Sequence, residues 1–315
     1  MRRLAAFIVS VVLLALIYWR INISNLFNAM GSAHWGLLTI AILCIVPLTL
    51  ATAWRFSMLT REAGVRFAEA LRMVLGASSL NLFLPSKMGD IAKAAVLVDR
   101  HGMDVKLALS ISIFDKLLDI GSLLFFGVIA LFWISPSSGR VIWALTFVTF
   151  VLLLLIIGLI LPFGPIPKSL RIVTRFASSQ ISGRILRFID AWQSFSVWFW
   201  RDRKRVLEVL SLSITIWFGH LMQYWLFVLS LGAHVPVLEN MAFATLGILA
   251  GLLPFTLAGI GSRDAALIYF YGAYLTPGQG AFLGILATLR YLIPALAGVP
   301  LVFYFVHTTR IAKRK

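Results

Sequence analysis

Apolar blocks of about 20 residues recur along the whole chain, and this is the length that crosses a hydrocarbon core of about 30 Å. Hydrophobic residues make up 60% of the 315 residues and charged residues only 13%, whereas a soluble domain carries about 25% charged residues. The longest polar stretch, about 168–205, is too short to bury a core of its own. We therefore predict an all-α polytopic membrane protein, a single integral membrane domain over 1–315 without a soluble catalytic domain.

Six of these blocks are long enough to cross the membrane as helices. They are 4–19, 36–54, 107–134, 141–162, 207–231 and 278–306. Tryptophan stands near several of their ends, as in the aromatic belt of membrane proteins. Arg2 and Arg3 before the first block resemble a signal peptide, but no small-residue cleavage site follows. The first block is therefore predicted to be an uncleaved span.

Two further apolar regions, 68–98 and 240–275, are interrupted near their centres by residues that break or cap helices. These are Asn81, Pro85, Ser86 and Gly89 in the first region, and Pro254, Gly259, Gly261 and Ser262 in the second. Proline lacks an amide hydrogen and glycine lowers helix propensity, and the apolar stretch after each break is too short to cross. Each region is predicted to be a re-entrant broken-helix hairpin, with Ser86 and Ser262 as N-caps of the returning arms.

The positive charges support this topology. The net charge is +16, but the basic residues lie in short loops, as the positive-inside rule requires, rather than in a nucleic-acid-binding surface. With a cytoplasmic N-terminus, most Lys and Arg residues fall in cytoplasmic segments, Arg55 among them, and only Arg20 and Arg140 fall outside. If both broken regions crossed fully, Arg100 and Lys106 would move outside, which the rule disfavours. We expect a bacterial cytoplasmic (inner) membrane protein with both termini in the cytoplasm.

This topology contains an internal repeat. Residues 36–134 and 207–306 each hold a span, a broken hairpin and a second span, and the hairpins enter from opposite sides. Such inverted repeats form midplane binding sites in many transporters. The segment 168–205 between them carries Ile185, Phe188, Ile189, Trp192 and Phe195 at helical spacing. It is predicted to be a cytoplasmic amphipathic helix on anionic lipid, with a loop that packs on the bundle as the alternative.

Nine ionisable residues fall at membrane depth, all in the broken hairpins or in the spans that directly follow them. They are Lys87, Asp90, Lys93, Asp115, Lys116, Asp119, Arg263, Asp264 and Arg290. A charge near the bilayer centre costs at least about 2.5–3.5 kcal/mol, so these residues need partners or a wet cavity. Lys87 and Arg263 adjoin helix breaks, where free N–H groups and the positive helix end favour an anion such as phosphate.

Two other interpretations of these charges compete with a role in binding phosphate. Asp115 and Asp119 lie one helical turn apart beside Lys116, and the three could form structural ion pairs. The same aspartates superficially resemble the motifs that hold magnesium in membrane transferases, but a further nearby acid is missing. The five histidines show no metal-ligand spacing. We therefore predict no metal site and no cofactor, and a protein that is not an enzyme, with a transferase as the alternative.

The hairpin motifs resemble those of a known family. The first is Asn81-x-x-x-Pro85-x-Lys87-x-Gly89-Asp90-x-x-Lys93 with Asp115-Lys116-x-x-Asp119, and the second is Gly259-Ile-Gly261-Ser-Arg263-Asp264 with Arg290. Both are similar to the lysylphosphatidylglycerol synthase transmembrane region, or flippase-like domain family, over nearly the whole chain. Its members often carry glutamate where this chain has Asp90, Asp115 and Asp264, and arginine at the three lysines. Aminoacyl-lipid members continue into a soluble transferase domain, whereas this chain stops at Lys315. The resemblance therefore implies lipid translocation rather than aminoacylation.

The resulting prediction is a lipid flippase or headgroup transporter for a phosphate-containing phospholipid or glycolipid. Lys87, Lys93, Arg263 and Arg290 would hold the phosphate, and Asp90, Asp115, Asp119 and Asp264 would tune the charge or bind amines. The alternatives are a membrane-embedded transferase, or an accessory subunit that presents lipid to a separate lipid-modifying enzyme in lipid-linked sugar or aminoacyl-lipid metabolism. A homodimer is left open, and no nucleic-acid partner is expected.

Overall fold

The computed structural model describes residues 23–83, 89–135, 139–162, 179–253, 256 and 259–303. Within these residues the regular elements are helices, and no strand occurs. The elements are α2 (Ile23–Gly31), α3 (Trp35–Leu43), α4 (Ile45–Leu59), the 3-10 turn η1 (Arg61–Ala63), α5 (Phe67–Phe83), α6 (Gly89–His101), α7 (Val105–Ile134), α8 (Arg140–Ile160), α10 (Ser179–Arg201), α11 (Arg203–Ser230), α12 (Val237–Leu252), α13 (Ser262–Phe270), α14 (Pro277–Gly298) and the 3-10 turn η6 (Val299–Leu301). The prediction of an all-α polytopic membrane protein is confirmed.

Five helical segments are long and apolar enough to cross a membrane, and they match five of the six predicted spans. They are Trp35–Leu59, Val105–Ile134, Arg140–Ile160, Arg203–Ser230 and Pro277–Leu301. The predicted first span, 4–19, lies outside the described residues. Two of the helices begin before their apolar blocks because Asp104 and Asp202 cap them, each accepting hydrogen bonds from two backbone N–H groups of the first turn.

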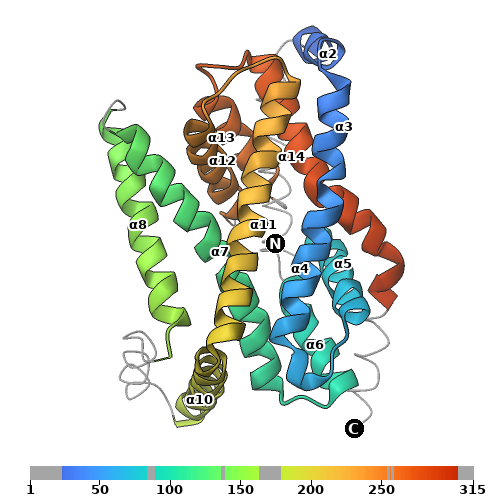
Figure 1. Cartoon of the computed structure of the whole chain (residues 1–315), viewed down its shortest axis with the longest axis vertical. Helices are drawn as coiled ribbons and strands as arrows, with labels where there is room; N and C mark the ends of the chain where they lie inside the picture. Colours follow the sequence, from blue (N-terminus) through green and yellow to red (C-terminus); the bar gives the residue numbers. More distant parts are fainter. Residues whose placement is uncertain are drawn as a thin grey trace.

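The two broken regions form helix pairs, α5 with α6 and α12 with α13, in opposite halves of the elongated molecule (Figure 1). Gly89 begins α6 so close to α5 that an added Cβ would lie 2.3 Å from the Ala77 carbonyl oxygen. Gly259 and Gly261 have φ angles of 77° and 98°, which side chains rarely adopt. The predicted break residues Pro85, Ser86, Lys87 and Pro254 lie outside the described residues.

The predicted capping role of Ser262 is wrong. Helix α13 begins at Ser262, and its N-cap is Gly261. The Gly261 N–H donates to the Asp264 carboxylate at 3.0 Å, so the Asp264 side chain, three residues after the N-cap, accepts a hydrogen bond at the N-terminus of α13. The Ser262 hydroxyl instead lies 2.8 Å from the Thr256 hydroxyl.

The helices of the two predicted repeats contact one another in matching pairs. The second arm of each hairpin packs on the last span of its own repeat, α6 on α7 and α13 on α14. The first arm packs on the last span of the other repeat, α5 on α14 and α12 on α7. The first spans of the two repeats, α3–α4 and α11, pack on each other. An inverted repeat would produce this pattern.

Helix α10 is amphipathic, as predicted, but its apolar face packs on the bundle rather than facing lipid. Ile189, Trp192 and Phe195 are buried. The Phe114 ring of α7 lies 5.9 Å from the Trp192 ring and 5.1 Å from the Phe195 ring, centroid to centroid. The placement on anionic lipid is therefore wrong for this stripe, because the same periodicity suits a protein surface equally well. Residues 168–178 lie outside the described part of the chain.

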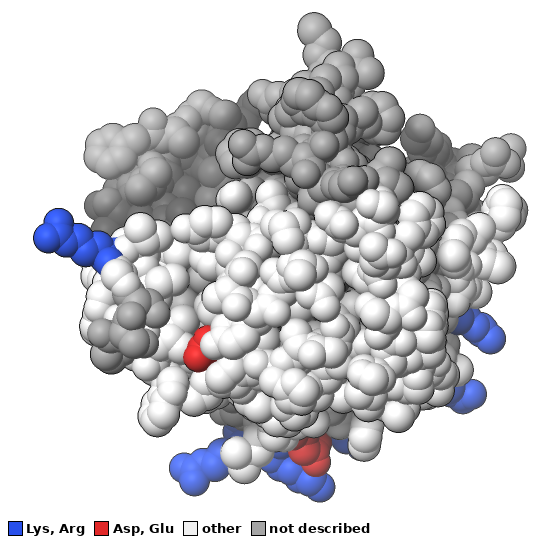
Figure 2. All heavy atoms as spheres, turned by 90° about the horizontal axis from the view of Figure 1, so that it is seen from above, with Lys and Arg blue, Asp and Glu red and all other residues white. Residues whose placement is uncertain are grey.

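Basic residues gather at one end of the molecule. Viewed from the α2 end, the described part of the face carries Lys and Arg almost only at its rim (Figure 2). At the opposite end, Arg61, Arg66, Arg100, Lys106, Arg201 and Lys204 stand at the ends of α4, α5, α6, α7, α10 and α11 (Figure 1). The asymmetry agrees with a cytoplasmic position for this second end.

Candidate functional site

A cavity of about 190 Å³ lies where the two predicted repeats meet. Its lining comes from α4, α5, α6 and α7 of the first repeat and from α11 and α14 of the second. Six of the nine predicted membrane-depth charges line it: Asp90, Lys93, Asp115, Lys116, Asp119 and Arg290. Five of these residues come from 90–119 and Arg290 comes from the other predicted repeat, so the fold brings the two repeats together at this cavity. Lys87 lies outside the described residues.

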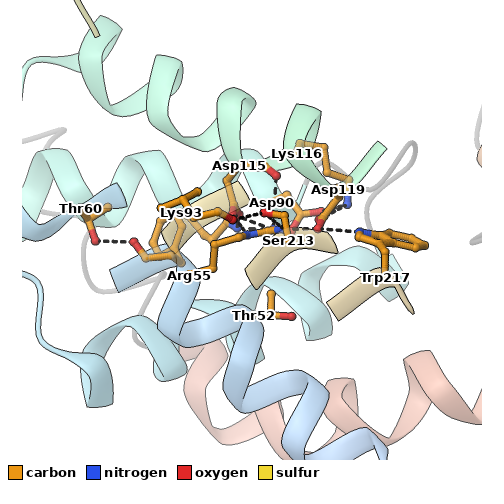
Figure 3. A network of polar contacts seen from close by, with 12 residues as sticks. Thr52, Arg55, Thr60, Asp90, Lys93, Asp115, Lys116, Asp119, Ser213 and Trp217 are labelled. Carbon is orange, nitrogen blue, oxygen red and sulfur yellow. Dashed lines mark hydrogen bonds and ion pairs between the residues drawn. The ribbon is translucent and has the colours of Figure 1, made fainter. Parts of the chain in front are cut away.

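On one side of the cavity, three carboxylates and three cations form a continuous network (Figure 3). Arg55 Nη2 lies 2.9 Å from Asp115 Oδ1 and 2.7 Å from Asp119 Oδ1. Lys93 Nζ lies 2.7 Å from Asp115 Oδ2, and Lys116 Nζ lies 3.0 Å from Asp90 Oδ2. The charges balance within the network, which lowers the cost of burying them.

Three neutral side chains complete the network. Asn81 Nδ2 donates to Asp90 at 3.2 Å. Trp217 Nε1 donates to Asp119 at 3.1 Å, and Arg55 Nη1 donates to the Ser213 hydroxyl at 3.3 Å (Figure 3). Helices α5 and α11 are thereby tied to the ions of α4, α6 and α7. The alternative of structural ion pairs was predicted for Asp115, Asp119 and Lys116. Asp115 is 3% exposed, and its partners Arg55 and Lys93 are 0% and 3% exposed.

Arg55 is the network residue that sequence reasoning missed. We expected it in a cytoplasmic segment after a span ending at residue 54, and this placement is wrong. Helix α4 continues to Leu59, and Arg55 is fully buried while the preceding Trp54 stays 56% exposed. One residue rotates the side chain by about 100° around a helix, enough to turn it from lipid to core. A sequence signal for a buried arginine was nevertheless present. Asp115 and Asp119 lie one helical turn apart, and a planar guanidinium can bridge two such carboxylates.

Arg263 and Asp264 do not line the cavity, and they neutralise each other. Arg263 Nη2 lies 3.0 Å from Asp264 Oδ1 and donates to the Thr288 hydroxyl of α14 at 2.6 Å. The other Asp264 oxygen accepts from the Gly261 N–H. The pair therefore braces the start of α13 against α14, and the structure does not bring the predicted phosphate ligand Arg263 to the cavity.

Arg290 of α14 also lines the cavity, and it differs from the network cations because it forms no ion pair with a described residue. It is only 6% exposed, and its Nε and Nη1 atoms have no hydrogen-bond partner among the described residues. The guanidinium carbon lies 4.7 Å from the Tyr224 ring centroid and 5.6 Å from that of Tyr291. Cation–π contacts offset part of the burial cost, about 2 kcal/mol when desolvated, but they leave the charge and the N–H donors available to an anion.

The described residues include no group of three or more His, Cys, Asp or Glu side chains arranged to hold a metal ion. The cavity is therefore best described by its charges. The network contributes no net charge and Arg290 contributes one positive charge, so a single negative charge would balance the described part of the lining.

Comparison with known proteins identifies related chains. The sequence profile of a family described as lysylphosphatidylglycerol synthase TM region matches residues 3–298, which include the whole cavity lining. The UPF0104 membrane protein MJ1595 of Methanocaldococcus jannaschii is 24% identical over 279 residues, which cover 84% of this chain and 83% of that protein.

Proposed function

Because the chain belongs to the family of the lysylphosphatidylglycerol synthase TM region, we propose that it is a lipid flippase. It moves a lipid with a phosphate headgroup across the bilayer, with the headgroup in the central cavity and the tails in the surrounding membrane. The substrate carries a net negative charge in its headgroup.

The observation that carries the proposal is Arg290, a buried guanidinium in a cavity between the two repeats that has no counterion among the residues the structure describes. Leaving a charge unpaired at membrane depth is costly, and such residues commonly mark substrate pathways. A phosphate oxygen would supply both the missing charge and the missing hydrogen-bond acceptors. Lys93 and Arg263, by contrast, already hold carboxylates at 2.7 and 3.0 Å.

The size and lining of the cavity suit a headgroup rather than a whole lipid. Its volume of about 190 Å³ is below the roughly 300–1,000 Å³ of sites that enclose drug-sized ligands. The lining also includes Ile45, Leu48 and Val74, which are compatible with the less polar end of a headgroup. The acyl chains would therefore stay in the bilayer while the headgroup crosses.

The test is lipid movement in liposomes that contain the purified protein and fluorescent, acyl-labelled phosphatidylglycerol. Dithionite quenching of the outer leaflet measures how fast inner-leaflet lipid appears outside. We expect wild-type protein to accelerate this step and Arg290→Gln to slow it about tenfold or more, because the phosphate loses a charge-assisted partner. Arg66→Gln, which removes an exposed arginine at the basic end, should leave the rate unchanged.

Wild-type movement without loss in Arg290→Gln would contradict the role of the cavity. Liposomes in which wild-type protein moves no lipid would contradict flippase function. Under that second outcome, metal-dependent release of a product would favour the transferase alternative, and movement only after addition of a lipid-modifying enzyme would favour the accessory-subunit alternative.

A further inference from the structure

Two carboxamide side chains at the wall of the central cavity each use their nitrogen but not their oxygen. Gln223 of α11 donates from Nε2 to the Ala41 carbonyl oxygen at 2.7 Å, and Asn81 of α5 donates from Nδ2 to Asp90. Both residues line the cavity. Gln223 Oε1 and Asn81 Oδ1 are shielded from water and have no hydrogen-bond partner among the described residues.

The orientation of both amides is determined by their partners. A carbonyl oxygen and a carboxylate can only accept hydrogen bonds, so each must face the NH₂ group and leave the amide oxygen at the other position. An amide oxygen can only accept, so it requires a donor. A buried acceptor without a donor costs about 1–3 kcal/mol, and such atoms in a native protein call for a missing partner.

The described part of the chain supplies no donor to these two oxygens, and it supplies no acceptor to Nε and Nη1 of Arg290, which lines the same cavity. A bare anion would satisfy Arg290 but would repel the two amide oxygens, because a phosphate diester has acceptors and no N–H or O–H. A headgroup that carries a hydroxyl beside its phosphate satisfies both: its charged oxygens face Arg290, and its hydroxyl donates to an amide oxygen.

We propose that the cavity selects lipids whose anionic phosphodiester headgroup also bears a hydroxyl, with Gln223 Oε1 as the principal acceptor and Asn81 Oδ1 as the second. The proposal rests on the proposed flippase function and adds a specificity to it. Gln223 is named as the principal acceptor because it is 1% exposed and lies on α11, a helix long and apolar enough to span the membrane. Sites built to bind a substrate hydroxyl discriminate strongly against analogues that lack it.

The experiment compares two lipids that share a charge and differ in the hydroxyl. Phosphatidylglycerol and phosphatidylmethanol are both monoanionic phosphodiesters, but only the first has hydroxyl groups. Acyl-labelled forms of both are placed in liposomes with wild-type protein, and their rates of movement are measured in parallel. We expect phosphatidylglycerol to move about fivefold faster, the effect of one or two net hydrogen bonds.

The variant Gln223→Met keeps the length of the side chain and removes the acceptor. We expect it to bring the two rates to within twofold of each other, whatever its effect on the absolute rates. The matched control is Asn240→Leu. Asn240 is also a buried amide, and it donates to the Leu221 carbonyl, but its oxygen accepts from the Tyr271 hydroxyl at 2.8 Å. This control should keep the wild-type preference.

Equal wild-type rates for the two lipids would overturn the inference while leaving the proposed flippase function intact. A preference that survives in Gln223→Met would also overturn it, because the acceptor would then lie elsewhere. Movement of neither lipid by wild-type protein would overturn the proposed function and, with it, this inference. The wild-type comparison does not depend on whether any variant folds.

Discussion

Three buried arginines differ in what their guanidinium groups contact, and on this difference we base the proposal that one of them binds the ligand. Arg55 holds two carboxylates, Arg263 holds one, and Arg290 holds none among the described residues. All three are at most 6% exposed. Burial by itself therefore does not distinguish the proposed binding residue. The balance of charge around each group does, because an unpaired buried charge is retained only at a cost to stability.

This contrast predicts opposite effects of the same substitution on stability. Arg55→Gln should destabilise the protein by about 3–5 kcal/mol, because Asp115 and Asp119 would be left as buried charges without this partner. Arg290→Gln should leave the melting temperature unchanged or raise it, because it removes a charge that has no counterion. Thermal unfolding in detergent micelles measures both, with Arg66→Gln as the exposed control. Equal losses in the two buried variants would contradict the assignment.

At the scale of helices, two glycines allow the last span of each repeat to approach the first hairpin arm of the other. Gly127 of α7 faces Thr245 of α12, and Gly298 of α14 faces Leu75 of α5. Next to the second contact, the Ser79 hydroxyl donates to the Ala295 carbonyl oxygen. Small residues permit such close helix contacts inside a membrane, where no hydrophobic force drives helices together.

The α5–α14 contact should be sensitive to a single methyl group. In Gly298→Ala the added Cβ would lie 2.0 Å from the Leu75 carbonyl oxygen, so backbone must move. We expect a loss of about 1–3 kcal/mol, seen as a lower melting temperature. Gly36→Ala is the matched control in α3, where nothing lies within 4 Å of the added Cβ; it should be neutral or slightly stabilising. Equal melting temperatures for the two variants would argue against this packing.

At the scale of the whole molecule, the uneven distribution of basic residues predicts which end faces the cytoplasm. In a Cys44→Ser background, Lys106→Cys and Lys204→Cys should react with an impermeable maleimide only from the cytoplasmic side. Arg140→Cys and His234→Cys, placed at the α8 start and between α11 and α12, should react only from the outside. Arg66→Cys, placed before α5, should react from the same side as Lys106→Cys, placed after α6. If Arg66 and Lys106 faced opposite sides, the α5–α6 pair would cross the membrane instead of returning, and the inverted repeat would be lost.

The sequence alone was sufficient to predict the helical class, five of the spans and the positions of two helix pairs. In hydrocarbon, every backbone N–H and C=O must find a partner within its own segment, so the lengths of apolar blocks and the positions of Pro and Gly are directly informative. The same local information predicted which ionisable residues lie at membrane depth, apart from Arg55, where a helix longer than its apolar block carried a charge inward.

The pairing of these charges was decided only by the tertiary structure. Arg55 meets Asp115 across 60 positions of sequence, and Gln223 meets Ala41 across 182. No local pattern reveals that Lys93 and Arg263 are neutralised while Arg290 is not. Hydrophobicity acts on each segment separately and can be summed along the chain, whereas the energy of a buried charge depends on the few atoms within about 4 Å of it, which come from other helices.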